Sequence, residues 1–371
     1  MGYYRISNSA GKQWILNAQH LRMGFQIYQP SSLKGKIVKS VLPILYNLGL
    51  KESVFRVIGA DKVEEPVIQG LRENCGEAFG RSVAELELNY FAGTPGNHQK
   101  MTIQISSGNT LLGYCKVASQ QDIRKLFYRE QKILDYFEKM GLENIPKCLR
   151  CCENQDGETI FIQDTKKNSH SRYVHELTDV HIRFLDEFCQ KTRVECNLED
   201  SDYGKMLLRL EDEANWILRS GFSENDVALL KNAILVIRER LITEKSYSAY
   251  HADFTPWNMF MDKKELYVFD FEYACLSYPP NLDIFHFIVQ SAIYEKNLSA
   301  KEIISEINQK YLGLLKRRFD DPWLSFLAYI LSVSEMYIRR DGGLFNKDVQ
   351  KEMQIRILLI NMIIYGKDVV Q

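Results

Sequence analysis

The feature that most constrains this chain is an ordered set of polar residues in its second half. The stretch His251-Ala-Asp253-Phe-Thr-Pro-Trp-Asn258 places an aspartate five residues before an asparagine, and Asp270-Phe-Glu272 follows after an apolar run. An aspartate on such a loop can accept a hydroxyl proton, while the asparagine and the second aspartate offer oxygen ligands for Mg²⁺. The pattern therefore predicts a phosphoryl-transfer site.

The segment from Met259 to Glu272 predicts a β-hairpin. Two runs of strand-type residues flank the polar turn Asp262-Lys263-Lys264. Such a hairpin would return Asp270 to a position beside Asn258. The loop pattern is only suggestive by itself, and the Asp-Phe-Glu that follows makes the prediction specific.

Two other interpretations of these residues are open. Asp253 and Asn258 are residue types that favour turns, where they would cap backbone groups and do nothing else. His251 and Asp253 could instead be metal ligands of a hydrolase, but no further histidine lies near enough in the sequence to complete such a set. The phosphoryl-transfer interpretation is favoured over both.

At these residues the chain resembles the aminoglycoside phosphotransferase and choline kinase superfamily, the small-molecule relatives of protein kinases. The family pattern His-Gly-Asp-(Leu/Phe)-x-x-x-Asn is present with Ala252 in place of the usual glycine, and the later Asp-(Phe/Trp)-Glu is also matched. The resemblance covers residues 85–290 and is specific only in the catalytic half. It implies the following roles: Asp253 as catalytic base beside His251, Asn258 and Asp270 as magnesium ligands, and Glu272 as an accessory metal group.

The resemblance extends to the segment after the hairpin. In Tyr278-Pro-Pro-Asn-Leu-Asp283, the aspartate stands where the family ties down its catalytic loop. The resemblance thus implies structural support of the loop by Asp283. An ordinary helix N-cap explains the same residue equally well.

A nucleotide-binding segment is predicted before the catalytic loop. Strand patterns joined by turns occupy residues 85–92, 100–106 and 111–118, and an amphipathic helix follows over 121–140. Lys116 in the third strand and Glu130 in the helix stand in the order of the kinase ion pair that points a lysine at the α- and β-phosphates. Lone Lys and Glu residues usually lie at the surface, so this order alone supports the pair.

Two weaker predictions also concern the nucleotide. The loop with Gly93 and Gly96 could lay backbone amides over phosphates, although it departs from Gly-x-Gly-x-x-Gly and a plain hairpin turn explains it nearly as well. After two more predicted strands, Gln163 and Asp164 begin a polar, aperiodic segment. By position this segment is the hinge whose backbone would meet the adenine.

Beyond residue 170 the sequence predicts helices over 178–192, 203–220, 223–245, 282–295, 299–317, 322–340 and 346–366. The expected fold class is α+β: a protein-kinase-like, two-lobed fold with an N-terminal antiparallel sheet lobe carrying one key helix, and a mostly α-helical C-terminal lobe. We expect three parts: residues 1–84 as an extension packed on the nucleotide lobe, 85–165 as the nucleotide-binding lobe and hinge, and 166–371 as the helical lobe with the catalytic loop and acceptor site.

Composition limits the partners and the compartment. A net charge of −1 over 371 residues argues against nucleic acid. No apolar signal core opens the chain, and its apolar runs are too short to span a bilayer, so a cytoplasmic protein is expected. Residues 33–51 are basic and amphipathic, which suits either a membrane-surface helix or, as we expect, a helix packed on the nucleotide lobe. The single Cys-x-x-Cys, at 148–151, has no second pair to complete a zinc site.

The acceptor leaves the weakest trace in the sequence. An acidic cluster that could bind a polycation consists of Glu195, Glu199, Asp200 and Asp202, although such runs are usually solvated. The prediction is an enzyme that uses ATP (or GTP) and Mg²⁺ to phosphorylate a hydroxyl of a small molecule: a sugar, polyol, amino alcohol or aminoglycoside-like compound. One alternative is an enzyme that phosphorylates proteins. It is disfavoured because Ala252 stands where such enzymes usually have arginine, and no Ala-Pro-Glu follows Asp270. The other alternative is a nucleotide-binding interaction module without turnover.

Overall fold

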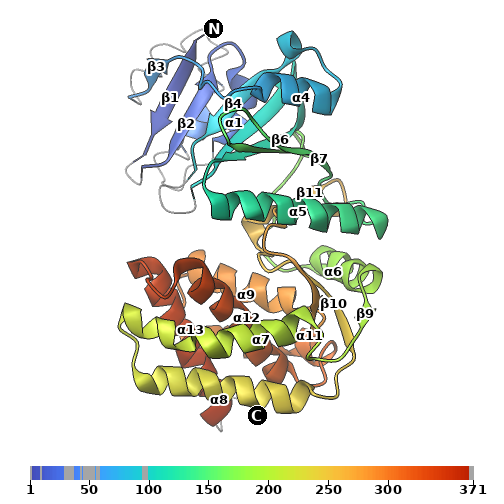
Figure 1. Ribbon diagram of the computed structural model, residues 1–371, viewed down its shortest axis with the longest axis vertical. Coiled ribbons are helices and arrows are strands. Elements are labelled where there is room, and N and C mark those ends of the chain that lie inside the picture. The colour runs from blue at the N-terminus through green and yellow to red at the C-terminus, as the bar shows by residue number, and fades with distance from the viewer. Residues whose placement is uncertain are drawn as a thin grey trace. The chain divides into compact units, whose positions relative to one another are not determined.

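A computed structural model describes residues 2–8, 11–28, 37–41, 44, 55, 59–93 and 99–366. The chain divides into two compact units (Figure 1). The first unit comprises residues 1–138 and 145–171, and the second comprises residues 139–144 and 172–371. Each unit is described by itself below.

The first unit is built on one antiparallel sheet of eight strands, in the order β3-β1-β2-β4-β5-β6-β8-β7. The strands are β1 (Tyr3–Ser7), β2 (Gln13–Asn17), β3 (Asp61–Val63), β4 (Glu87–Phe91), β5 (Met101–Ser107), β6 (Thr110–Ala118), β7 (Cys148–Glu153) and β8 (Thr159–Asp164). The helices whose bounds lie within the described residues are α1 (Leu21–Ile27), α4 (Leu71–Phe79), the short 3₁₀ turn Val83–Glu85, and α5 (Gln121–Lys139).

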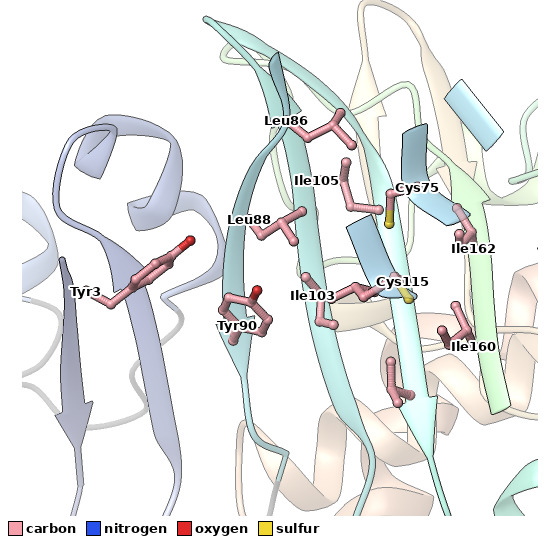
Figure 2. Packing of buried hydrophobic residues seen from close by; sticks show 12 residues of the cluster. Tyr3, Cys75, Leu86, Leu88, Tyr90, Ile103, Ile105, Cys115, Ile160 and Ile162 are labelled. Atoms are coloured by element: carbon pink, nitrogen blue, oxygen red, sulfur yellow. The ribbon is translucent and has the colours of Figure 1, made fainter. Parts of the chain in front are cut away.

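Alternation along the strands gives the sheet two different faces. Alternate residues of the central strands point into a buried cluster that α4 covers, as Figure 2 shows for Leu88, Ile103, Cys115 and Ile160 together with Cys75 of the helix. The residues between them point to the opposite face. There Phe161 of β8 meets Phe127 of α5, with ring centroids 5.9 Å apart.

The second unit is mostly helical. Its helices are α6 (Asp179–Lys191), α7 (Asp202–Glu213), a 3₁₀ segment (Ala214–Ser220), α8 (Glu224–Leu241), α9 (Leu282–Tyr294), α10 (Ala300–Glu306), a π-helical turn (Ile307–Tyr311), α11 (Leu312–Lys316), α12 (Pro322–Asp341) and α13 (Lys347–Tyr365). Its strands are short: β9 (Val194–Glu195), β10 (Ser246–Tyr250) and β13 (Cys275–Tyr278) form one sheet, and β11 (Met259–Asp262) and β12 (Glu265–Val268) form a hairpin.

These two units confirm the predicted fold class, with an antiparallel sheet and one long helix in the first and helices around small strands in the second. The predicted helix over 299–317 is interrupted by the π-helical turn. The division of the chain at residues 84 and 165 stays a prediction, although β2 pairs directly with β4 and so continues the sheet into the first 84 residues.

Two predictions about membranes concern residues 33–51 and the apolar runs of the chain. Most of residues 33–51 lie outside the described residues, so the packing expected for this segment stays a prediction; residues 37–41 and 44 are helical. Among the described residues, no helix combines the length and the apolar character needed to cross a bilayer.

Candidate active site

The loop after β10 is anchored by Asp283, a buried residue of α9. Its Oδ2 accepts a hydrogen bond from the backbone N–H of His251 at 2.9 Å, and its Oδ1 accepts one from Ala252 at 3.2 Å. Burial raises the pKa of Asp283 to about 7, against the lowering effect of those two hydrogen bonds. Asn281 precedes the first residue of α9, so Asp283 lies inside the helix and is not its N-cap.

The turn at Ala252 requires an unusual backbone. Ala252 has a φ of 68°, in the left-handed region that a side chain disfavours and glycine tolerates. The turn sets the two N–H groups of His251 and Ala252 toward one carboxylate and directs the chain on to Asp253.

His251 uses both ring nitrogens on the backbone of the site. Its Nε2 lies 3.1 Å from the carbonyl oxygen of Phe269, and its Nδ1 accepts the N–H of Asp253 at 3.1 Å. Burial lowers the pKa of His251 to about 4, so the ring is neutral near pH 7, with the proton on Nε2. The ring therefore ties the loop to the end of the hairpin, and a direct part in catalysis stays a prediction.

Asp253 and Asn258 lie on one loop and contact each other. The side-chain nitrogen of Asn258 donates to Asp253 Oδ2 at 2.7 Å and to the Asp253 carbonyl oxygen at 3.1 Å. The intervening residues Thr255 and Pro256 lead into a single 3₁₀ turn, Pro256–Asn258, with proline at its start. The Asp253 side chain is 32% exposed, so part of the carboxylate is open to solvent.

The predicted hairpin is present and returns the chain to this loop. Met259 of β11 pairs with Val268 of β12, and the N–H of Phe269 donates to the Asn258 carbonyl oxygen at 3.0 Å. Asp270 therefore follows directly after a residue bonded to Asn258. Its own φ of 70° is left-handed, which marks a sharp turn at the end of the hairpin.

The carboxylates of this site act together on a neighbouring tyrosine. Burial raises the pKa of Tyr273, and the charges of Glu272, Asp270 and Asp253 raise it further, whereas Arg340 lowers it. The carboxylates of Asp270 and Glu272 and the amide oxygen of Asn258 are hard oxygen donors of the kind that Mg²⁺ prefers.

In the first unit, the structure brings Lys116 and Glu130 together. Lys116 Nζ lies 3.0 Å from Glu130 Oε1 and 2.7 Å from Oε2, and both side chains are buried. Strand alternation explains the position of Lys116, because Cys115 and Val117 face the α4 side and Lys116 faces α5. Its Nζ also lies 5.5 Å from the centroid of Phe161.

The other residues predicted to meet the nucleotide are less informative. Gly93 has a φ of 77°, and a Cβ there would collide with the carbonyl oxygen of Lys100. Gly96 lies outside the described residues. Gln163 is buried, and its Oε1 has no hydrogen-bond partner in the described part of the chain. Asp164 Oδ1 accepts the N–H of Lys147 at 2.7 Å, and burial raises its pKa.

The acidic cluster is spread over the surface of the second unit. Glu195, Glu199 and Asp200 are exposed, and Asp202 Oδ2 accepts the N–H of Leu276 at 2.9 Å. Asp202 thus joins α7 to β13.

Sequence reasoning missed one residue that touches the site, His286 of α9. Its Nε2 lies 3.4 Å from Asp253 Oδ1. The signal was present in the spacing, because residues three apart on a helix share a face and Asp283 was already assigned to the loop.

Comparisons with known proteins add a likeness in structure. No family model matches the chain, and no curated protein matches it. The chain is similar to a thermostable mutant of aminoglycoside phosphotransferase APH(4)-Ia, with 14% identity, a TM-score of 0.49, and coverage of 78% of this chain and 97% of that one. It is also similar to amicoumacin kinase hAmiN in complex with AMP-PNP, Ca²⁺ and Ami, with 11% identity, a TM-score of 0.46, and coverage of 78% and 91%.

A third similar structure is spectinomycin phosphotransferase APH(9)-Ia in complex with ADP and spectinomycin. The identity is 12%, the TM-score is 0.45, and the alignment covers 80% of this chain and 95% of that one.

Proposed function

We propose that this protein is a phosphotransferase that uses ATP (or GTP) and Mg²⁺ to phosphorylate a hydroxyl group of a small molecule. The observation that carries the proposal is the Asp253–Asn258 contact of 2.7 Å on a loop held by Asp283. A turn that only capped backbone groups would not need Asp283 of α9 to fix the N–H groups of His251 and Ala252. It would also not need a partly exposed carboxylate at its centre.

Asp253 is the proposed base. One of its oxygens is held by Asn258, and its exposed side is free to accept the proton of an acceptor hydroxyl. A positioned base of this kind contributes about 10²- to 10⁴-fold to the rate. His251 and Asp283 support this group by fixing the backbone on either side of Ala252.

The residues present fit a magnesium site. Asn258 and Asp270 would be the ligands, with Glu272 as an accessory group, because their side chains offer the oxygen donors that Mg²⁺ prefers. When bound, Mg²⁺ would neutralise charge on the nucleotide phosphates.

The Lys116–Glu130 pair is the proposed contact to the nucleotide phosphates. Glu130 holds the lysine ammonium inside the first unit, where the ammonium would meet a phosphate oxygen. The backbone around Gly93 and Gly96 would meet the phosphates, and that of Gln163 and Asp164 the adenine. An interaction module without turnover would not need both this pair and the Asp253 loop, so their joint presence supports the enzyme.

A transfer assay tests the proposal. The protein is incubated with ATP labelled in the γ-phosphate, Mg²⁺, and a library of sugars, polyols, amino alcohols and aminoglycosides. We expect label to move to one acceptor class, and the Asp270→Ala variant to transfer none. Label released only as inorganic phosphate, or recovered on protein alone, would contradict a small-molecule acceptor.

A further inference from the structure

His286 is a buried histidine whose ring lies beside the carboxylate of Asp253, the proposed base. It lies on α9, three residues after Asp283, and is 1% exposed. Its Nε2 is 3.4 Å from Asp253 Oδ1, without the alignment of a full hydrogen bond. Asp283 and His286 thus come from one face of one helix, and the first holds the backbone of the loop while the second faces its functional side chain.

Among the described residues, no group offers the His286 ring a better-placed hydrogen-bond partner than Asp253. In the described part of the chain, neither ring nitrogen has an aligned hydrogen-bond partner, and the ring packs edge to face against Tyr329 at 5.7 Å. A buried polar group without a partner costs about 1–3 kcal/mol. An apolar side chain would fill the same space without that cost, so packing alone does not account for a histidine here.

We propose that His286 is a positioning residue that donates its Nε2–H to Asp253 Oδ1 and thereby fixes the orientation of the carboxylate. This inference rests on the proposed function, in which Asp253 is the base. Asn258 holds Oδ2, and His286 holds Oδ1, so that the carboxylate cannot rotate about its Cβ–Cγ bond. Because His286 is buried, it reaches the acceptor only through Asp253.

The proposed role predicts which kinetic parameter changes when His286 is substituted. A carboxylate held by Asn258 alone still binds the acceptor and leaves the nucleotide contacts intact, but spends less time aimed at the hydroxyl proton. The defect therefore falls on kcat and not on KM, since misplacement of a reacting group slows the chemical step.

Two substitutions separate positioning from packing. His286→Gln keeps a donor near the position of Nε2, and His286→Met keeps the volume but removes the donor. We expect His286→Met to lower kcat about 10-fold with both KM values changed less than about 2-fold, and His286→Gln to stay within about 3-fold of the wild type. The matched control is Gln290→Met, the same kind of change one turn further along α9, which should leave kcat unchanged.

A spectroscopic measurement tests the contact without any turnover. In long-range ¹H–¹⁵N spectra of the histidine rings, the His286 signals are assigned by their loss in His286→Gln. Replacing the carboxylate in Asp253→Asn should shift the Nε2 signal of His286, and should leave that of the exposed His170 in place. An unchanged His286 signal would overturn the contact, including in the case that His286→Met does not fold.

The outcomes distinguish this inference from the proposed function. Wild-type turnover in Asp253→Asn would overturn the proposed function itself. An inactive Asp253→Asn with full activity in His286→Met, or an equal loss of kcat in Gln290→Met, would overturn the positioning role alone. Loss of activity in His286→Gln as complete as in His286→Met would also overturn it, because the retained donor should rescue the base.

Discussion

A single backbone angle at Ala252 decides how the loop presents Asp253. The side chain at this position has a cost of about 1–2 kcal/mol for the left-handed conformation. Glycine removes that cost but gives the unfolded chain more freedom, worth about 0.4–1 kcal/mol. The backbone strain that glycine removes exceeds the freedom that it adds to the unfolded chain, so the balance favours glycine.

We predict that Ala252→Gly raises the free energy of unfolding by up to about 1.6 kcal/mol. The control is Ala228→Gly at an exposed position inside α8, where the backbone is an ordinary helix and glycine should lower the stability by about 0.5–1 kcal/mol. Chemical denaturation of both variants checks the difference. A loss of stability in Ala252→Gly equal to that of the control would mean that the turn is not strained.

The Lys116–Glu130 pair links stability to the proposed nucleotide contact. Because Glu130 is fully buried, Lys116→Met removes the ion-pair partner of a buried carboxylate and should cost roughly 3–5 kcal/mol of stability. Adding Glu130→Gln to that variant removes the charge and should recover most of the stability. Calorimetry with ATP should show weak binding in both variants. Wild-type ATP affinity in the stable double variant would remove Lys116 from the nucleotide site.

At the scale of elements, the β11–β12 hairpin carries the proposed metal ligand. Asp270→Ala should abolish Mg²⁺-supported turnover, because it removes a charged ligand from a site that also uses the neutral amide of Asn258. Asn258→Ala should be severe but leave residual activity, and Glu272→Gln should be milder than Asp270→Ala. Titration of each variant with Mg²⁺ decides the order. Full activity of Asp270→Ala at ordinary Mg²⁺ would remove the metal role.

Helix α6 supplies a pH-dependent contribution to stability. His181 is buried in its first turn, where its Nδ1 lies 3.1 Å from the N–H of Thr178, and burial lowers its pKa from 6.5 to about 4. Between pH 6.5 and pH 4, His181 is protonated in the unfolded chain and neutral in the folded chain. The contribution is therefore present above pH 6.5 and is lost as the pH falls toward 4.

We predict that the stability advantage of the wild type over His181→Gln shrinks by about 3 kcal/mol between pH 6.5 and pH 4. Denaturation curves of both proteins across this range measure it, and the other titrating groups cancel in the difference. A constant difference would show that the His181 ring takes up its proton at the same pH in the folded and the unfolded protein.

For the whole molecule, the sequence was most predictive where local periodicity and function coincide. Alternation in β5 and β6, the apolar spacing of α5, and the polar turn of the hairpin each identify an element from neighbouring residues alone. The spacing within α5 even contained a further signal, because Glu130 falls in the buried stripe with Phe127 and Leu134. A charged residue in such a stripe requires a partner, and Lys116 supplies it.

Other parts could not be read from local pattern. The strands β1, β2 and β3 are three to five residues long, and β1 pairs with β3 across more than fifty residues of chain. Such pairing is decided by tertiary contacts, which a local window does not contain. The contact between His286 and Asp253 was hidden for the same reason, since a buried histidine in an apolar helix reads as core until its neighbours are placed.

The central claim is that Asp253 is the base of a phosphotransferase. The most direct measurement combines turnover on the identified acceptor with calorimetry of ATP and Mg²⁺ binding to Asp253→Asn. That substitution keeps the size of the side chain and removes its charge. The account predicts that kcat falls by about 10²-fold or more while ATP affinity barely changes. Turnover like that of the wild type would rule out catalysis by this loop, and loss of ATP binding would show that Asp253 holds the fold or the metal instead.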